Sequence, residues 1–155
     1  MPANHDPARG ERIVRGATFG LAGLGLLAGV VALVVAEGEA RGHAFAHLLT
    51  GLLCLGLFAA LAFPWHPRAG SGAATLRGLV ITLLALAALG SFMESLGGAG
   101  YDAANGGRRI EALTTLHDIF VPFGALLIGA VPLGVITGIA VLIARMTGRG
   151  GRVRT

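Results

Sequence analysis

Lysine is absent from this sequence, and cysteine, tryptophan and tyrosine each occur once. A single cysteine, Cys54, excludes a disulfide within the chain, a dithiol redox pair and a metal cage made of cysteines; its place in an apolar run suits a small packing residue. The few serines stand in no nucleophile-elbow motif, and no phosphate-binding loop is present. The basic residues flank apolar runs and do not alternate with aromatic residues, so nucleic-acid binding is not expected.

Charge is also scarce, because only 13% of the residues are charged, against roughly 25% in an ordinary soluble domain. Hydrophobic residues make up 54% of the chain, and the mean hydropathy is +0.76. A chain of 155 residues has room for four spans of about twenty residues each, but not for a separate soluble domain as well. The composition therefore predicts an integral membrane protein.

Four apolar runs of bilayer length predict an all-α integral membrane protein folded as a four-helix antiparallel transmembrane bundle. The first run follows three arginines and resembles a secretory signal, but at about twenty residues it is too long, so we interpret it as an uncleaved span. Gly38 is predicted to stop the first helix, Thr115 to Asp118 to cap the last one, and Pro132 to kink it. The predicted membrane domain covers 17–145, with spans at about 17–36, 43–63, 73–96 and 117–144.

Arginine is distributed unevenly between the two sides of this bundle. If the N-terminus is cytoplasmic, the inner side carries nine arginines and the outer side three, which are Arg41, Arg108 and Arg109. This asymmetry favours a cytoplasmic N-terminal tail (1–16) and a basic cytoplasmic tail (146–155), because positive charge stays on the cytoplasmic side. We expect the protein in the bacterial cytoplasmic membrane, with the lipid bilayer as its first partner.

The first span contains glycines at a spacing that allows a neighbouring helix backbone to come close. This spacing predicts contact with another helix of this chain, with a second copy in a homo-oligomer, or with a larger membrane complex. The residues concerned are Gly16, Gly20, Gly25 and Gly29.

Most of the acidic residues and three of the five histidines fall on the predicted outer side. His43 and His47 stand four residues apart, so their side chains leave one face of the second helix. Antiparallel threading brings His117, at the start of the last span, to the same rim. Glu94 lies near the C-terminal end of the third helix, where the helix dipole disfavours a negative charge, and therefore needs a positive partner.

Two functional interpretations of this rim remain open. In the first, the chain is a binding module for electron transfer or sensing, which uses His47, His117 and His43 for b-type haem, or His43, His47, Glu94, His117 and Asp118 for a divalent transition metal. This layout resembles small membrane b-type cytochromes in architecture, without a shared motif. In the second, the protein is a structural or accessory membrane subunit without a cofactor, whose histidines are ordinary interfacial residues. No catalytic residue is predicted.

Overall fold

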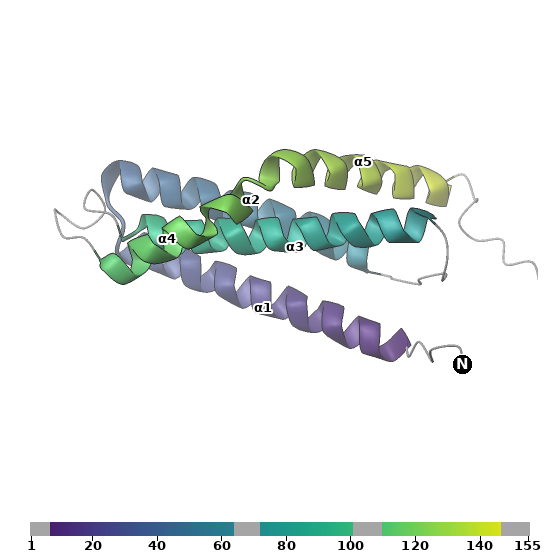
Figure 1. The fold of residues 1–155 in the computed structure, drawn as a ribbon, viewed down its shortest axis with the longest axis horizontal. Coiled ribbons are helices and arrows are strands. Elements are labelled where there is room, and N and C mark those ends of the chain that lie inside the picture. The colour runs from purple at the N-terminus through teal and green to yellow at the C-terminus, as the bar shows by residue number, and fades with distance from the viewer. Residues whose placement is uncertain (1–6, 64–71, 101–109, 147–155) are drawn as a thin grey trace, which may run out of the picture.

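The computed structural model describes residues 7–63, 72–100 and 110–146. Within these ranges all regular secondary structure is α-helical, which confirms the all-α prediction (Figure 1). The five helices are α1 (Pro7–Val34), α2 (Gly38–Ala62), α3 (Gly72–Gly98), α4 (Glu111–Gly124) and α5 (Leu127–Met146).

Three of these helices, α1, α2 and α3, are each long and apolar enough to cross a membrane. The pair α4 and α5 passes the same test only when taken together, and the two helices are bent by 46° at the break between them. The described residues therefore contain three candidate membrane spans, or four if α4 and α5 together count as one span. This supports the prediction of a membrane protein.

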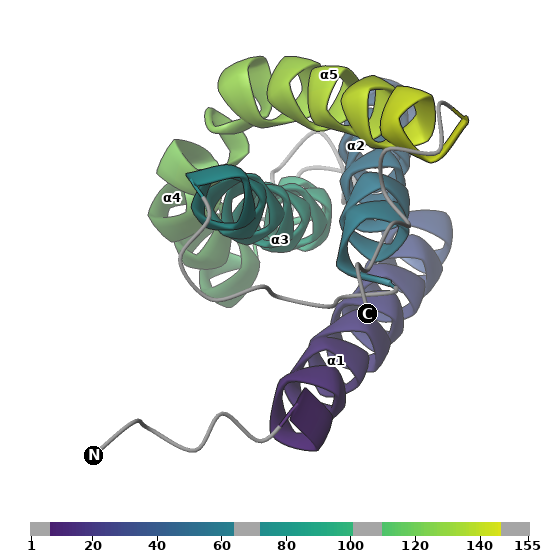
Figure 2. The same cartoon turned by 90° about the vertical axis from the view of Figure 1, so that its right-hand side faces the viewer.

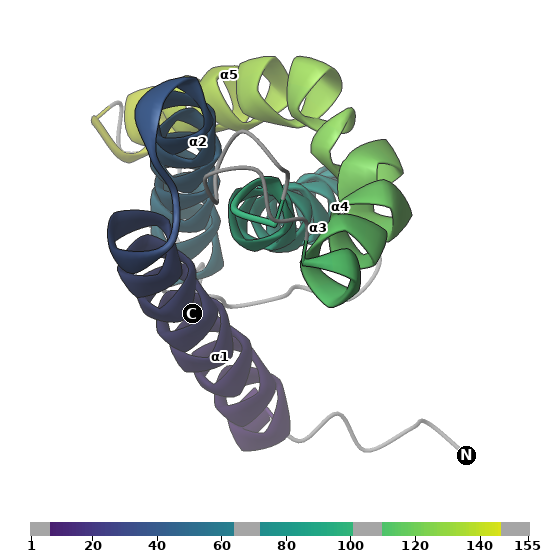
Figure 3. The ribbon, with the colours of Figure 1, turned by 90° about the vertical axis from the view of Figure 1, so that its left-hand side faces the viewer.

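Helix α3 occupies the centre of the structure. Seen end-on, α2, α4 and α5 surround it, and α1 lies beside α2 and α3 (Figures 2 and 3). Figure 1 shows α1 and α3 running in one direction while α2, α4 and α5 return in the other. Small residues on α3, such as Ala87, Ala88 and Gly90, are buried and let its neighbours approach closely.

The side chain of Phe92, fully buried on α3, joins α3 to α1 and α2. A Cβ added at Gly25 of α1 would lie 2.8 Å from the Phe92 ring, and one added at Gly51 of α2 would lie 2.5 Å from it. Both helices thus use a glycine to accommodate this ring. Gly29 similarly faces Leu48, at 3.2 Å. A Cβ at Gly16 or at Gly20 would meet nothing within 4 Å.

The connections between helices involve two arginines near the helix ends. Gly38 has a φ of +53°, which glycine adopts without strain, and it begins α2 after α1 has ended at Val34. At this turn the Arg41 Nε donates to the Ala36 carbonyl at 2.7 Å. At the opposite end, the Arg77 Nε donates to the Leu61 carbonyl at 2.8 Å, near the C-terminus of α2.

The helix boundaries differ from the predicted spans at both ends of the chain. Helix α1 begins at Pro7, so residues 7–16 of the predicted tail are helical; proline is well suited to the first position of a helix, and Arg15 pairs with Glu11 at 2.6 Å. The predictions for residues 1–6, for the 64–71 turn with His66, for the 101–109 loop and for the 147–155 tail lie outside the described residues.

The predicted cap at the start of the last helix was wrong. Helix α4 begins at Glu111 with Ile110 at its N-cap and no side-chain cap, so Thr115 and Asp118 lie inside a helix and do not form a capping box. The segment from Glu111 to Leu113 is made of strong helix formers, which extend the helix beyond the apolar run. The Thr114 hydroxyl donates to the Glu111 carbonyl at 3.0 Å within the first turn of α4.

Helix α5 continues through Pro132, where a kink was predicted, and the 46° bend between α4 and α5 lies at 125–126. Packing against α3 explains the position of the bend. A Cβ at Gly90 of α3 would lie 2.6 Å from the Gly124 backbone nitrogen, and the side chain of Glu94 fills the place of a Gly124 side chain. The chain therefore touches α3 at Gly124 and turns away directly afterwards, so that α5 packs on α2 and α3.

Candidate functional site

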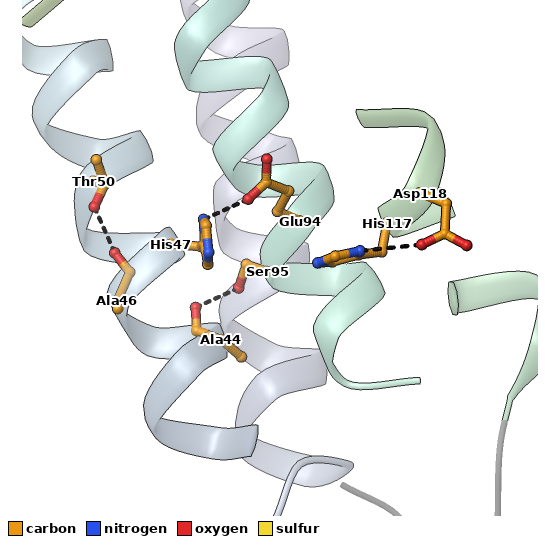
Figure 4. A network of polar contacts seen from close by, with 8 residues as sticks. All are labelled: Ala44, Ala46, His47, Thr50, Glu94, Ser95, His117 and Asp118. Carbon is orange, nitrogen blue, oxygen red and sulfur yellow. Dashed lines mark hydrogen bonds and ion pairs between the residues drawn. The ribbon is translucent and has the colours of Figure 1, made fainter. Parts of the chain in front are cut away.

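Three helices bring polar side chains together at one end of the bundle. These are the first turns of α2, the last turns of α3 and the middle of α4 (Figures 1 and 4). We call this group the rim cluster; it consists of His43, His47, Glu94 and His117. All four were predicted to meet at this rim.

The closest contact in the rim cluster joins α2 to α3. The His47 Nδ1 lies 2.9 Å from the Glu94 Oε2, and the side chain of Glu94 is only 7% exposed, against 22% for His47 (Figure 4). A carboxylate that is almost fully withdrawn from solvent requires a hydrogen-bond donor, and the imidazole N–H supplies it. The sequence predicted a positive partner for Glu94, and the structure places His47 against it as a hydrogen-bond donor.

The three imidazole rings form a chain across α3. The centroids of the His43 and His47 rings are 4.5 Å apart, and those of His43 and His117 are 6.3 Å apart. Two glycines of α3 create the space for these rings. A Cβ at Gly98 would lie 3.2 Å from the His43 Cδ2, and one at Gly97 would collide with the backbone and Cβ of His117.

Asp118 stands apart from the buried part of the rim cluster. Its side chain is 65% exposed, and its Oδ1 lies 3.5 Å from the His117 Nδ1, at the upper limit of a hydrogen bond. Figure 4 shows Asp118 on the side of His117 that faces away from Glu94 and His47. Across the described parts of the chain, no three or more His, Cys, Asp or Glu side chains are already arranged to hold a metal ion.

Sequence reasoning missed the residues that fix the spacing of the three helices. The Ser95 hydroxyl donates to the Ala44 carbonyl at 2.7 Å, a buried hydrogen bond between α3 and α2 in the same turns as the rim cluster. Gly97, Gly98 and Gly124 allow the close approaches to His117, His43 and Glu94. The adjacent glycines of α3 are visible in the sequence, but nothing local to them indicates what they touch.

The ring nitrogens are oriented in a consistent way. Both His47 and His117 direct Nδ1 towards a carboxylate, and this leaves Nε2 of each ring on the other side. Carboxylate–histidine pairs of this kind fix the tautomer and the direction of an imidazole, and they recur behind histidines that bind metals. In both rings Nε2 is therefore the atom that could bind a metal ion.

Searches with family models, against curated proteins and against solved structures find nothing that matches this chain.

Proposed function

We propose that this protein is a membrane-embedded binding module that holds one divalent first-row transition metal ion, such as Zn²⁺, Cu²⁺ or Ni²⁺, at the rim cluster. The observation that carries the proposal is the contact between His47 and the nearly buried Glu94, together with the nearby imidazole rings of His43 and His117. Imidazole nitrogen is a preferred ligand of these ions.

His43, His47 and His117 are the proposed ligands, through nitrogen atoms not directed at a carboxylate. Glu94 and Asp118 act as positioning residues in this proposal, because each is oriented towards an Nδ1. Glu94 is near enough to become a fourth ligand if its side chain rotates. Binding of the ion draws the three rings together from their present spacing, and His43, the most exposed of the three, has the most freedom to move.

A compact ion fits the surroundings of the rim cluster better than b-type haem does. Haem needs a flat slot between its two axial imidazoles and beside them. Here α3 lies directly against the rings, because Gly97 contacts His117 and Gly98 contacts His43. Inserting a macrocycle between the histidines would require α3 and α4 to separate, whereas a metal ion requires only side-chain rotations.

In the membrane we propose an up-down-up-down arrangement with both termini cytoplasmic, in which α4 and α5 together form the fourth span. The helix directions in Figure 1 and the arginine asymmetry support this arrangement. The rim cluster then lies at the extracytoplasmic face, where it meets ions from outside the cell.

Titration of the purified, metal-free protein with Co²⁺ tests the proposal, because Co²⁺ absorbs visible light when protein ligands replace its water. We expect one ion per chain, displaced by Zn²⁺, and a rise in thermal stability with metal concentration. His47→Ala and His117→Ala should each lower the affinity more than tenfold. Glu94→Gln should lower it roughly 10- to 100-fold through the orientation of His47.

Matched variants at the same rim and on the opposite side serve as controls. Glu39→Gln makes the same change at an exposed carboxylate near the start of α2, and His66→Ala removes a histidine outside the described residues. Both should bind Co²⁺ as the wild type does. Equal affinity in the wild type and in a His47→Ala/His117→Ala variant would refute the proposal, and a haem absorption band in the reduced protein would favour the cytochrome interpretation.

A structural or accessory role without a cofactor is the second candidate, and the glycines of α1 favour it in part. Gly25 and Gly29 are used inside the chain, against Phe92 and Leu48, whereas a Cβ at Gly16 or Gly20 would meet nothing of this chain within 4 Å. In this interpretation the contact between His47 and Glu94 only joins two helices. His47→Ala and Glu94→Gln should then both lower the thermal stability. The thermal stability of the wild type should not change when metal is added.

A further inference from the structure

Helices α2 and α3 are joined at the rim cluster by two polar contacts that lie side by side. The Ser95 hydroxyl donates to the Ala44 carbonyl at 2.7 Å, and the His47 Nδ1 lies 2.9 Å from the Glu94 Oε2 (Figure 4). The two contacts use consecutive residues of α3 and residues about one turn apart on α2. Ser95 and Ala44 are both fully buried, so water does not compete for their hydrogen bond.

The contact made by Ser95 differs from those of other hydroxyl groups in these helices. A Ser or Thr hydroxyl inside a helix ordinarily donates to the carbonyl four residues earlier in the same helix. This is what Thr18, Thr50 and Thr82 do. Ser95 instead donates to another helix, whereas Ser91, one turn away on the same face of α3, is fully buried and has no hydrogen-bond partner among the described residues. Burial of a serine on this face therefore does not by itself produce a contact with α2.

The two contacts hold the helices with different firmness. The Ala44 carbonyl belongs to the backbone of α2, and a serine hydroxyl is separated from its own backbone by only one rotatable side-chain bond. The contact between His47 and Glu94 passes through two longer side chains. Side-chain tips lie about 5–6 Å from a helix axis, so a rotation of α2 by about 20° would move the His47 ring by roughly 2 Å and break its hydrogen bond. Burial alone does not resist such a rotation, because lipid is as apolar as the side chains.

We propose that Ser95 is a positioning residue of the rim cluster: its bond to the Ala44 carbonyl fixes the rotation of α2 against α3, and this rotation directs the His47 ring at the buried carboxylate of α3. The same rotation holds His43 against Gly98, where a Cβ would lie 3.2 Å from the His43 Cδ2. The proposal rests on the metal site proposed above where it concerns affinity, because both histidines are proposed ligands there. The orientation of the His47 ring belongs to the metal-free protein and is tested without any ion.

Nitrogen NMR of the metal-free, full-length protein with isotope-labelled histidine rings tests this orientation, at about pH 8 where an ordinary imidazole is neutral. The two ring nitrogens differ in chemical shift according to which one carries the proton. In the wild type we expect His47 in one tautomer, with the proton on Nδ1; its signals are identified by their absence in His47→Ala. In Ser95→Ala the ring is released from Glu94, so its two nitrogen signals should move towards each other as both tautomers become populated. Ser91→Ala is the matched control, because it makes the same change at a buried serine without a contact to α2, and it should leave these signals unchanged.

Metal affinity provides the second measurement. Ser95→Ala should lower the affinity for Co²⁺ about tenfold, whereas Ser91→Ala should bind Co²⁺ as the wild type does. If Ser95 acts through the contact between His47 and Glu94, its removal has no further effect once that contact is lost. Ser95→Ala/Glu94→Gln should therefore bind Co²⁺ no more weakly than Glu94→Gln alone.

Unchanged His47 signals in a Ser95→Ala protein of wild-type helicity would overturn the proposal, and a lower thermal stability with those signals unchanged would assign Ser95 to packing alone. Additive losses of affinity in the double variant would also overturn it, because Ser95 would then act independently of Glu94. A wild type that binds no Co²⁺ would refute the metal site proposed above, but the NMR comparison of Ser95→Ala with Ser91→Ala would still decide the role of Ser95.

Discussion

At the scale of single residues, the rim cluster depends as much on glycines as on its polar side chains. Glu94 is held between His47 on one side and the backbone of Gly124 on the other. The absence of a side chain at Gly124 is what allows the carboxylate to remain near α4 and be shielded from solvent. A carboxylate withdrawn in this way keeps its hydrogen bond to the imidazole without competition from water.

Replacement of Gly124 by alanine should therefore disturb the rim cluster. The added methyl group would overlap the Glu94 carboxylate, so Glu94 or α4 must move, and overpacking of this kind costs about 1–3 kcal/mol of stability. Gly138→Ala on α5 is the control, since a Cβ there meets nothing within 4 Å; it should be neutral or stabilise by about 0.5–1 kcal/mol. Thermal unfolding in detergent measures both, and equal behaviour of the two variants would contradict this explanation.

The sequence was sufficient to predict which residues meet at this rim, because antiparallel threading fixes the height of each residue along its helix. It was not sufficient to predict which pairs form. The contact between His47 and Glu94 depends on the rotation of α2 and α3 about their axes, and strongly apolar helices carry little periodic signal to set that rotation. The role of Gly124 depends on Glu94, thirty residues away in the chain, so no local pattern reveals it.

At the scale of helices, packing of α1, α2 and α3 is organised by one aromatic ring. Lipid is as apolar as a leucine side chain, so burial alone cannot hold these helices together, and close fit must do so. Phe92 provides this fit, since it enters the spaces that Gly25 and Gly51 leave open. The sequence identified Gly25 as a contact residue, but its partner could not be inferred from the spacing of glycines.

Removal of the Phe92 ring should loosen all three helices. We expect Phe92→Ala to destabilise the protein by about 3–5 kcal/mol, because it leaves a cavity where three helices meet. Phe19→Ala is the matched control, since Phe19 is 76% exposed on α1, and its change should stay within about 0.5 kcal/mol. Chemical or thermal unfolding with a helicity readout compares the two. A loss for Phe92→Ala no greater than that of the control would show that the ring is not central to the packing.

The break between α4 and α5 lies directly after a close contact with α3. Proline at 132 predicts a kink by sequence alone, because it lacks the N–H of the helical hydrogen bond. The bend between α4 and α5 lies at 125–126, directly after the close contact with α3 at Gly124. The predicted starts of the first and last helices also differ from those observed. An apolar run marks the part of a helix that fits the bilayer, whereas the helix itself can extend beyond it.

Substitution of Pro132 should accordingly leave the bend in place. In Pro132→Ala, the distance between spin labels at Ile119 and Ile139, both exposed, should match that of the unsubstituted chain. Both measurements use a background without Cys54, so that only the introduced cysteines carry labels. A lengthening of this distance in Pro132→Ala would mean that the proline, and not the contact at Gly124, maintains the bend between α4 and α5.

At the scale of the whole molecule, arginine and the acidic residues divide the protein into two ends. The rim cluster lies at the end where α1 turns into α2, and the exposed arginines at the start of α1 lie at the other end. If the positive end is cytoplasmic, a metal ion at the rim cluster would be bound from outside the cell. The proposed metal site and the exposed arginines would then be on opposite sides of the same bilayer.

The orientation itself is open to a direct test with reporter fusions whose activity depends on their compartment. Fusions at residue 40, within 66–71, within 101–109 and at the C-terminus should report outside, inside, outside and inside, because we expect each helix or bent helix pair to cross the bilayer once. The fusion at the C-terminus is the most informative. If α4 and α5 form a re-entrant loop rather than one broken span, the C-terminus returns to the outer side, and only that fusion changes. A C-terminus found outside would therefore refute the fourth span while leaving the other three, and the outer position of the rim cluster, intact.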